Sequence, residues 1–126
     1  MIFISVEEVI DYHEDMIHTF GGLPGIRDIG LLISAMEMPK AIFFDEDLHP
    51  TVFDKAAAYL FHLISNHPFM DANKRTATIT MLTFLETNGV KLAFNAIEME
   101  NLVVDVAQGK ISKKSIAIFL ANCATD

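Results

Sequence analysis

The chain has few of the residues that mark secreted, membrane-spanning or metal-binding proteins. It has 126 residues and one cysteine, Cys123, which can form neither an internal disulfide nor a cysteine-based zinc site. The longest apolar run, residues 56–63, is interrupted by His62 and is far shorter than the ~20 residues of a membrane span. No basic segment precedes the first apolar residues. We therefore expect a protein of the reducing cytoplasm, with no signal peptide and no membrane partner.

Positive charge is also scarce. The sequence has 9 Lys and Arg against 17 Asp and Glu, which gives a net charge of −8. Affinity for a phosphate backbone comes from many Lys and Arg contacts, so direct binding of nucleic acid is not expected. Only Arg27 and Arg75 are arginines. Because arginine suits bidentate phosphate binding, both positions are candidate binding residues.

Apolar residues, by contrast, are plentiful and recur at helical spacing. A hydrophobic content of 52% in a chain of this length predicts one domain, residues 1–126, with a substantial core. Capping boxes at Ser5 and Thr51, further caps at Asp28 and Ser112, and stops at Gly or Pro predict the helix ends. The predicted helices span about residues 6–19, 28–38, 51–66, 73–88, 96–108 and 112–122.

Four other features have simple interpretations. The third predicted helix is apolar almost all round, which is typical of a central helix. Residues 39–50 have a proline near each end and predict a loop with a short extended stretch at 41–44. His13 and His18 are one residue too far apart for the H-E-x-x-H zinc pattern, so we expect helix histidines near the surface. Lys113 and Lys114 are expected to be solvated.

The segment HPFMDANKRTAT, residues 67–78, gathers most of the polar chemistry. Free N–H groups at a helix start bind anions, and Lys74, Arg75 and the Asn73 amide would add to that site beside the titratable His67. Asp71 would oppose an anion unless a cation joins it, and Mg²⁺ carried by nucleotide phosphates would do so. The alternative is structural: an Asp cap, a packed His and surface cations.

The same residues resemble a known family. H-P-F-x-D-A-N-K-R-T-A is similar to the core motif of the Fic/Doc superfamily, and most similar to the Doc (death-on-curing) toxins. GGLPGIRD at 21–28 and V-x-x-V-A-x-G-x-I-S at 103–112 also resemble Doc-like stretches, so the resemblance covers essentially the whole chain. It implies an all-α, compact bundle of about six helices with a short extended flap.

The resemblance also implies residue roles. By motif position, His67 would be the general base, Asp71 would hold Mg²⁺, and Asn73 with its backbone would form the anion hole. Lys74 would lie in that hole and Arg75 would bind phosphate. Arg27 would contact phosphate or target, or it would order its loop through a salt bridge with Asp28 or Glu46; both interpretations stay open.

Two departures bear on the reaction. AMP-transferring Fic proteins have a second glycine and a final arginine where this chain has Lys74 and Thr78. Doc shares both changes and resembles a protein kinase that binds ATP in reverse and modifies a threonine of elongation factor Tu. We therefore favour phosphate transfer from Mg-ATP to a Ser or Thr of a translation protein. Adenylyl transfer and a catalytically silent partner-binding module are the alternatives.

The resemblance finally implies partners. Some Fic proteins inhibit themselves through a helix with S/T-x-x-x-E-G/N, and the nearest segment here, residues 96–101, lacks the hydroxyl. A separate antitoxin whose C-terminal tail folds as a helix into an apolar groove is therefore expected. The 39–50 loop would dock the target as an added strand, or it would be a hydrophobic lid over the core.

Overall fold

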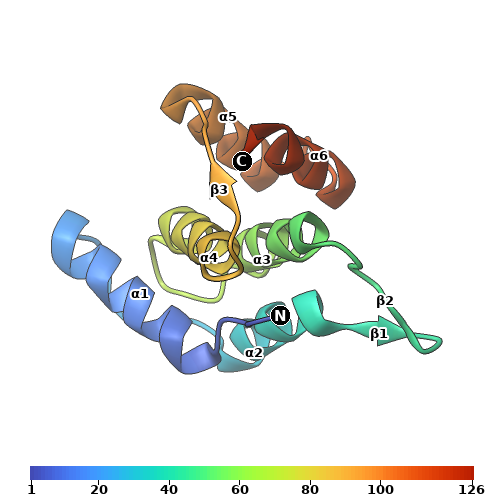
Figure 1. Ribbon diagram of the computed structural model, residues 1–126. Helices are drawn as coiled ribbons and strands as arrows, with labels where there is room; N and C mark the ends of the chain where they lie inside the picture. Colours follow the sequence, from blue (N-terminus) through green and yellow to red (C-terminus); the bar gives the residue numbers. More distant parts are fainter.

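The computed structural model describes residues 1–126 and confirms the predicted helical bundle. Six α-helices follow the predicted ranges to within about two residues. They are α1 (Val6–Phe20), α2 (Ile29–Glu37), α3 (Val52–Asn66), α4 (Asn73–Thr87), α5 (Ala96–Ala107) and α6 (Lys113–Cys123), with a 3-10 turn, η1 (Met38–Lys40), after α2 (Figure 1). None of the helices is both long and apolar enough to cross a bilayer.

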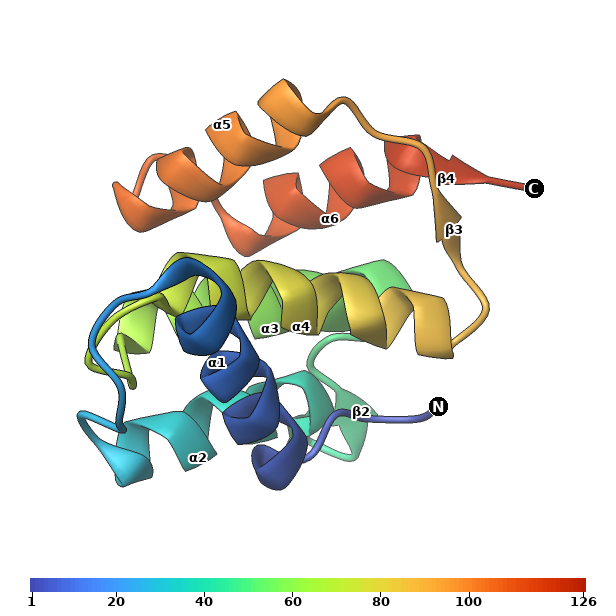
Figure 2. The ribbon, with the colours of Figure 1, turned by 90° about the vertical axis from the view of Figure 1, so that its left-hand side faces the viewer.

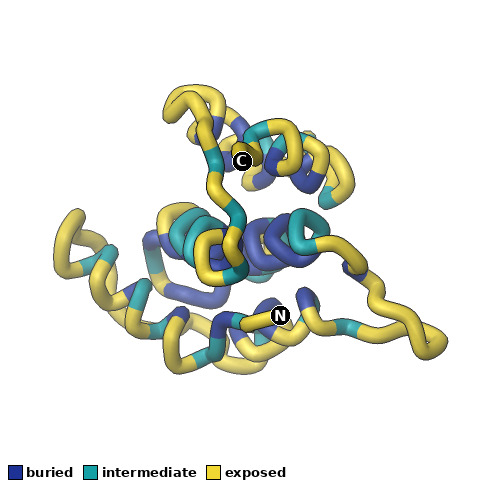
Figure 3. The backbone as a smooth tube through the Cα atoms, in the orientation of Figure 1, coloured by how far each residue is buried: buried dark blue, intermediate teal, exposed yellow.

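The helices form three layers. Helices α3 and α4 lie side by side in the middle, with α1 and α2 on one side and α5 and α6 on the other (Figure 2). Helix α3 is central because its apolar residues point in every direction, and even its Lys55 is buried. The buried part of the chain is accordingly concentrated in α3 and α4 (Figure 3). This places the α3–α4 connection, residues 67–72, at one end of the central layer.

The helix starts follow from the predicted caps. The Ser5 hydroxyl accepts from Glu8 N at 3.1 Å while the Glu8 carboxylate accepts from Ser5 N at 3.1 Å. Asp28 accepts from Leu31 N at 3.0 Å to begin α2. These side chains satisfy backbone N–H groups that have no partner within the helix.

Two short antiparallel strand pairs complete the fold. Strands β1 (Ile42–Phe43) and β2 (Glu46–Asp47) form a hairpin that projects from the bundle (Figure 1). The hairpin side chains Ile42, Phe43 and Phe44 are 68%, 63% and 86% exposed. The hairpin is therefore the predicted extended flap and not a lid over the core.

The second pair joins β3 (Lys91–Leu92) to β4 (Ala124–Thr125). It joins residues 124 and 125 to the segment that follows α4. The sequence analysis did not predict this pair, because two residues per strand leave no alternation to detect.

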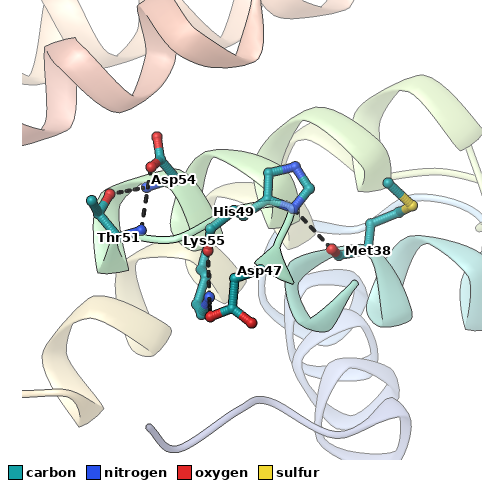
Figure 4. A network of polar contacts seen from close by, with 6 residues as sticks. All are labelled: Met38, Asp47, His49, Thr51, Asp54 and Lys55. Atoms are coloured by element: carbon teal, nitrogen blue, oxygen red, sulfur yellow. Dashed lines mark hydrogen bonds and ion pairs between the residues drawn. The ribbon is translucent and has the colours of Figure 1, made fainter. Parts of the chain in front are cut away.

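The base of the hairpin is fixed by a polar network (Figure 4). The His49 ring donates from Nδ1 to the Met38 carbonyl oxygen at 3.0 Å. The Lys55 ammonium donates to the His49 carbonyl oxygen and, at 3.2 Å, to Asp47 Oδ2. A capping box between Thr51 and Asp54 begins α3 directly after this network.

Lys113 corrects one prediction. Its ammonium is not solvated but lies 3.0 Å from both His49 Nε2 and His62 Nε2, which accept its hydrogens. The packing of α6 against α3 causes this, since it brings the first turn of α6 over two imidazoles. Lys114 agrees with the prediction, because its side chain is 76% exposed.

Candidate active site

The predicted site begins where α3 ends. His67 follows the last residue of α3 and adopts the left-handed conformation, with φ 50° and ψ 54°. This conformation turns the chain sharply before Pro68. The His67 side chain is exposed and has no hydrogen-bond partner within the chain. Its ring nitrogens are therefore available to exchange a proton with a bound molecule.

A cleft of ≈ 400 Å³ lies beside His67. Residues 70–75 form most of its wall, and Ile64 of α3 and Ala107 of α5 complete it. The cleft thus brings together five of the six predicted site residues: His67, Asp71, Asn73, Lys74 and Arg75.

The start of α4 presents unpaired donors to this cleft. Ala72 takes the left-handed conformation, with φ 60°, and provides no side-chain cap. The first N–H of α4 with a backbone partner is that of Thr76, which donates to Ala72 O at 3.0 Å. The N–H groups of residues 73–75 have no such partner, and neither Lys74 nor Arg75 pairs with a carboxylate. Three free N–H groups and two unpaired cations make an anion-binding site.

Asn73 corrects part of the prediction. Its side chain is buried, accepts from Phe69 N at 2.9 Å and donates to Phe69 O at 3.0 Å. Because both ends of the amide bind the backbone of Phe69, the side chain shapes the loop and is not a free donor. Only the backbone N–H of Asn73 faces the anion site.

Asp71 is held by two backbone groups. Its Oδ2 accepts from Leu23 N at 3.1 Å and its Oδ1 accepts from Ala72 N at 2.8 Å. These two N–H groups lower the pKa of the Asp71 carboxyl, and Arg75 and His13 lower it further. Gly22 lies against the carboxylate, since a Cβ on Gly22 would be 2.7 Å from Asp71 Oδ2. The carboxylate is therefore ionised and its direction is fixed.

A single fixed carboxylate such as Asp71 can hold Mg²⁺ only if other ligands complete the coordination of the ion. No group of three His, Cys, Asp or Glu side chains could hold an ion by itself. Mg²⁺ prefers one or two carboxylates together with phosphate oxygens and water. Each oxygen of Asp71 retains acceptor capacity beyond its single N–H partner, so the residues fit an ion that arrives with a nucleotide.

Arg27 does not line the cleft, and its contacts favour the second of its two predicted roles, the ordering of its loop. Its Nε donates to His67 O at 2.6 Å and its NH2 group donates to Asn66 O at 2.8 Å. Backbone N–H groups of residues 27 and 28 also donate to Pro68 O, at 2.7 and 3.0 Å. Arg27 therefore orders the turn at His67, as one interpretation expected, but through carbonyl oxygens and not through a salt bridge with Asp28 or Glu46.

His13 is a residue that the sequence analysis missed. It was expected near the surface but is only 2% exposed, and its ring stacks on Phe69 with centroids 3.9 Å apart and planes 6° apart. Its Nε2 lies 3.0 Å from the Asp71 carbonyl oxygen. The signal in the sequence was its place in the apolar series of the first helix, with Val9 and Ile10 before it and Ile17 after it.

The substituted motif position, Thr78, makes an internal bond. Its hydroxyl donates to Lys74 O at 2.7 Å, so it is not directed at a ligand in the cleft. Arg75 instead lies over the ring of Phe20, with 5.1 Å between the guanidinium carbon and the ring centroid.

An apolar groove of ≈ 540 Å³ runs beside the cleft, between α1, α4 and α5. Lys74 and Arg75 border both the groove and the cleft. The apolar side chains that line the groove are Met16, Phe20, Ile79, Leu82, Phe94, Ala96, Met99, Val103 and Val104.

The sequence is similar to those of known proteins over most of its length. A sequence model described as the Fic/DOC family matches residues 3–85. A protein named toxin Doc from Mycolicibacterium smegmatis is 44% identical over 107 residues, which are 83% of this chain and 82% of that protein. A protein named protein kinase doc from Escherichia phage P1 is 39% identical over 117 residues, which are 93% of this chain and 91% of that protein.

Proposed function

The chain belongs to the Fic/DOC family, and from that membership and the geometry of the cleft we propose that it is a Doc-like toxin that transfers phosphate from Mg-ATP to a Ser or Thr hydroxyl of a translation protein. One observation carries the proposal. The unpartnered imidazole of His67 and the anion-binding start of α4 line the same cleft.

His67 would act on the attacking hydroxyl. The hydroxyl oxygen forms a bond to the γ-phosphorus, and the bond between that phosphorus and the β–γ bridging oxygen breaks. The hydroxyl proton passes to an unprotonated nitrogen of the His67 ring, and ADP leaves. The exposed position of His67 supports this role, because a general base must reach the proton that it removes.

The α4 start would hold the phosphates. The free N–H groups of residues 73–75 would bind phosphate oxygens, and Lys74 and Arg75 would neutralise their charge. Asp71 would hold Mg²⁺ that enters with the nucleotide. Bound there, the ion would supply positive charge that offsets the negative charge of the phosphates.

Two residues favour phosphate transfer over AMP transfer. Lys74 places a full charge where AMP-transferring relatives have a glycine. Thr78 stands where they have an arginine and so supplies no second guanidinium, and its hydroxyl donates to Lys74 O. We propose that this single cationic cluster binds the terminal phosphate of a triphosphate, since the cluster and His67 line the same cleft. The similarity to the protein named protein kinase doc also supports phosphate transfer over AMP transfer.

The target would meet the β1–β2 hairpin. The hairpin exposes backbone edges and three large apolar side chains next to the bundle. An extended segment of the target would pair with it as a further strand, which sets the position of its hydroxyl. Elongation factor Tu is the first target to test.

The experiment uses labelled nucleotide. The purified chain is incubated with elongation factor Tu, or with ribosome-associated proteins, and with Mg-ATP labelled at the α- or at the γ-phosphate. Label on these proteins is then measured. The proposal expects transfer of the γ-label only. Transfer of the α-label would identify an adenylyltransferase, and transfer of neither label to elongation factor Tu or to ribosome-associated proteins would leave a binding module.

The apolar groove would receive an antitoxin. An amphipathic helix could place its apolar face against Phe20, Phe94 and Val104, which line the groove and are exposed. Because Lys74 and Arg75 border both cavities, a helix in the groove would lie next to the phosphate site. A disordered tail that folds on binding suits such a groove.

A further inference from the structure

His13 lies behind the cleft and has no part in the proposed chemistry. It projects from α1, is 2% exposed, and does not line the cleft. Its two contacts are both with the 67–72 loop: the stacked ring of Phe69 and the carbonyl oxygen of Asp71. Because a carbonyl oxygen can only accept, Nε2 of His13 must carry the hydrogen of this bond.

The peptide unit between Asp71 and Ala72 is held at both ends. His13 Nε2 donates to its oxygen at 3.0 Å, and its N–H donates to Asp71 Oδ1 at 2.8 Å. Since a peptide unit is planar, fixing the direction of its C=O also fixes the direction of its N–H. That N–H is one of the two groups that orient the Asp71 carboxylate, the other being Leu23 N.

The surrounding loop makes this support necessary. Ala72 takes a left-handed conformation at φ 60°, which residues other than glycine adopt only at a cost. Phe69 is already fixed by the Asn73 amide at both its N–H and its carbonyl oxygen. Only the His13 bond fixes the carbonyl oxygen of Asp71.

We propose that His13 is a positioning residue, which fixes the Asp71–Ala72 peptide and thereby directs the Asp71 carboxylate toward the cleft. The inference rests on the proposed function in one respect, because it assigns that carboxylate to the metal of a bound nucleotide. The effect on the carboxylate itself can be measured without nucleotide.

The test compares two variants, each of which keeps one of these two interactions of His13 and removes the other. His13→Phe keeps a ring that can stack on Phe69 and removes the N–H donor. His13→Gln removes the ring but places an amide N–H at the same number of bonds from the backbone. His18→Phe, an exposed histidine of the same helix, is the control.

The first measurement is amide hydrogen exchange at Leu23 and Ala72, the two N–H groups bound to Asp71. In His13→Phe we expect the exchange rates of both amides to rise about tenfold or more relative to the rate of the Phe84 amide in the core. In His13→Gln we expect the ratio of these rates to the Phe84 rate to equal that of the wild type. A purely structural His13 would accelerate all three amides together in both variants. That outcome, or an unchanged ratio in His13→Phe, overturns the proposal.

The second measurement is ATP binding by calorimetry with Mg²⁺ and with a chelator. Loss of a residue that orients a metal ligand typically costs about 10–100-fold in affinity. His13→Phe should therefore reduce the gain in affinity that Mg²⁺ provides by about tenfold, and His13→Gln should restore it. If the wild-type chain modifies no protein, the proposed function fails while the exchange result still decides the role of His13.

Discussion

His67 combines a reactive side chain with an unusual backbone conformation, so its replacement must separate the two. Its φ of 50° lies in the left-handed region, which asparagine tolerates better than most residues. His67→Asn should lower transfer by about 10²–10⁴-fold with little change in melting temperature, because it removes only the base. His67→Ala should lose the same activity and a further ~1 kcal/mol of stability.

These variants are checked by single-turnover transfer of γ-label and by thermal unfolding. Near-wild-type transfer in His67→Asn would remove His67 as the general base. Equal melting temperatures of the two variants would contradict only the expectation that alanine is less stable than asparagine in the left-handed conformation of residue 67.

Gly21 and Gly22 give a matched pair at the same turn. Both have positive φ, 81° and 117°, so alanine strains the backbone at either position. A Cβ at 21 meets nothing within 4 Å, whereas a Cβ at 22 would be 2.7 Å from Asp71 Oδ2. We expect each alanine to cost ~1 kcal/mol of stability, and Gly22→Ala alone to weaken Mg-ATP binding.

Urea unfolding and calorimetry measure these two effects. Equal losses of Mg-ATP affinity in both variants would show that the approach of Gly22 to Asp71 has no bearing on the site.

At the scale of elements, α6 is joined to α3 through Lys113 and two imidazoles. Burial, with the charge of Lys113 second, lowers the pKa of His62 to about 4, and the same causes lower the pKa of His49. Both rings are therefore neutral acceptors for one ammonium. Since the folded chain resists protonation at His62, this site stabilises it fully above pH ~6.5 and progressively less as pH falls toward 4.

The expected decrease in the free energy of unfolding is of the order of 1 kcal/mol, because His62 is partly exposed and solvent screens part of the effect. Urea midpoints between pH 7 and 4.5 measure it. His62→Gln, which keeps an acceptor for Lys113 but cannot titrate there, should flatten this part of the profile. An identical profile in the variant would exclude His62 as its source.

Removing the ammonium tests the electrostatic part of this junction. Lys113→Met should raise the pKa of His62, yet leave it below the usual value because burial, the larger cause, remains. Titration of the imidazole signals by NMR measures this, with the exposed Lys114→Met as control. A His62 pKa that does not move would mean that Lys113 contributes only packing.

At the scale of the whole molecule, the groove between α1, α4 and α5 should decide whether an antitoxin can neutralise the chain. We expect expression alone to arrest growth and co-expression with the antitoxin to restore it. Val104→Lys, in the groove, should preserve arrest and prevent rescue, because a helix there would bury an unpaired charge.

Ile118→Lys is the control for this experiment, since it places the same charge at an exposed position on α6 outside the groove. Colony counts with and without the antitoxin are the measurement. Rescue of Val104→Lys at the wild-type level would place the antitoxin elsewhere, and harmless expression of the chain alone would mean that no antitoxin is needed.

The six helices and most of the residues that line the cleft can be predicted from local patterns in the amino-acid sequence. The caps at Ser5, Asp28, Thr51 and Ser112 were all predicted and are all formed. Such signals are readable because a cap acts on N–H groups two or three residues away, and helical periodicity relates neighbours within one turn. His67, Asp71, Lys74 and Arg75 could be placed together for the same reason: they lie within nine residues around one helix start.

The contacts that hold residues 67–75 in place come from distant parts of the chain and follow from the packing of the helices. His13 reaches Asp71 across 58 residues, Leu23 across 48, and Arg27 reaches His67 across 40. From the sequence, His13 is expected near the surface, and Arg27 is expected either to contact phosphate or target or to form a salt bridge. Nothing local distinguishes such side chains from ones that meet a carbonyl oxygen in a distant loop. These contacts arise only when α1 and the 21–28 segment pack against residues 67–72, and the direction of the Asp71 carboxylate follows from that packing.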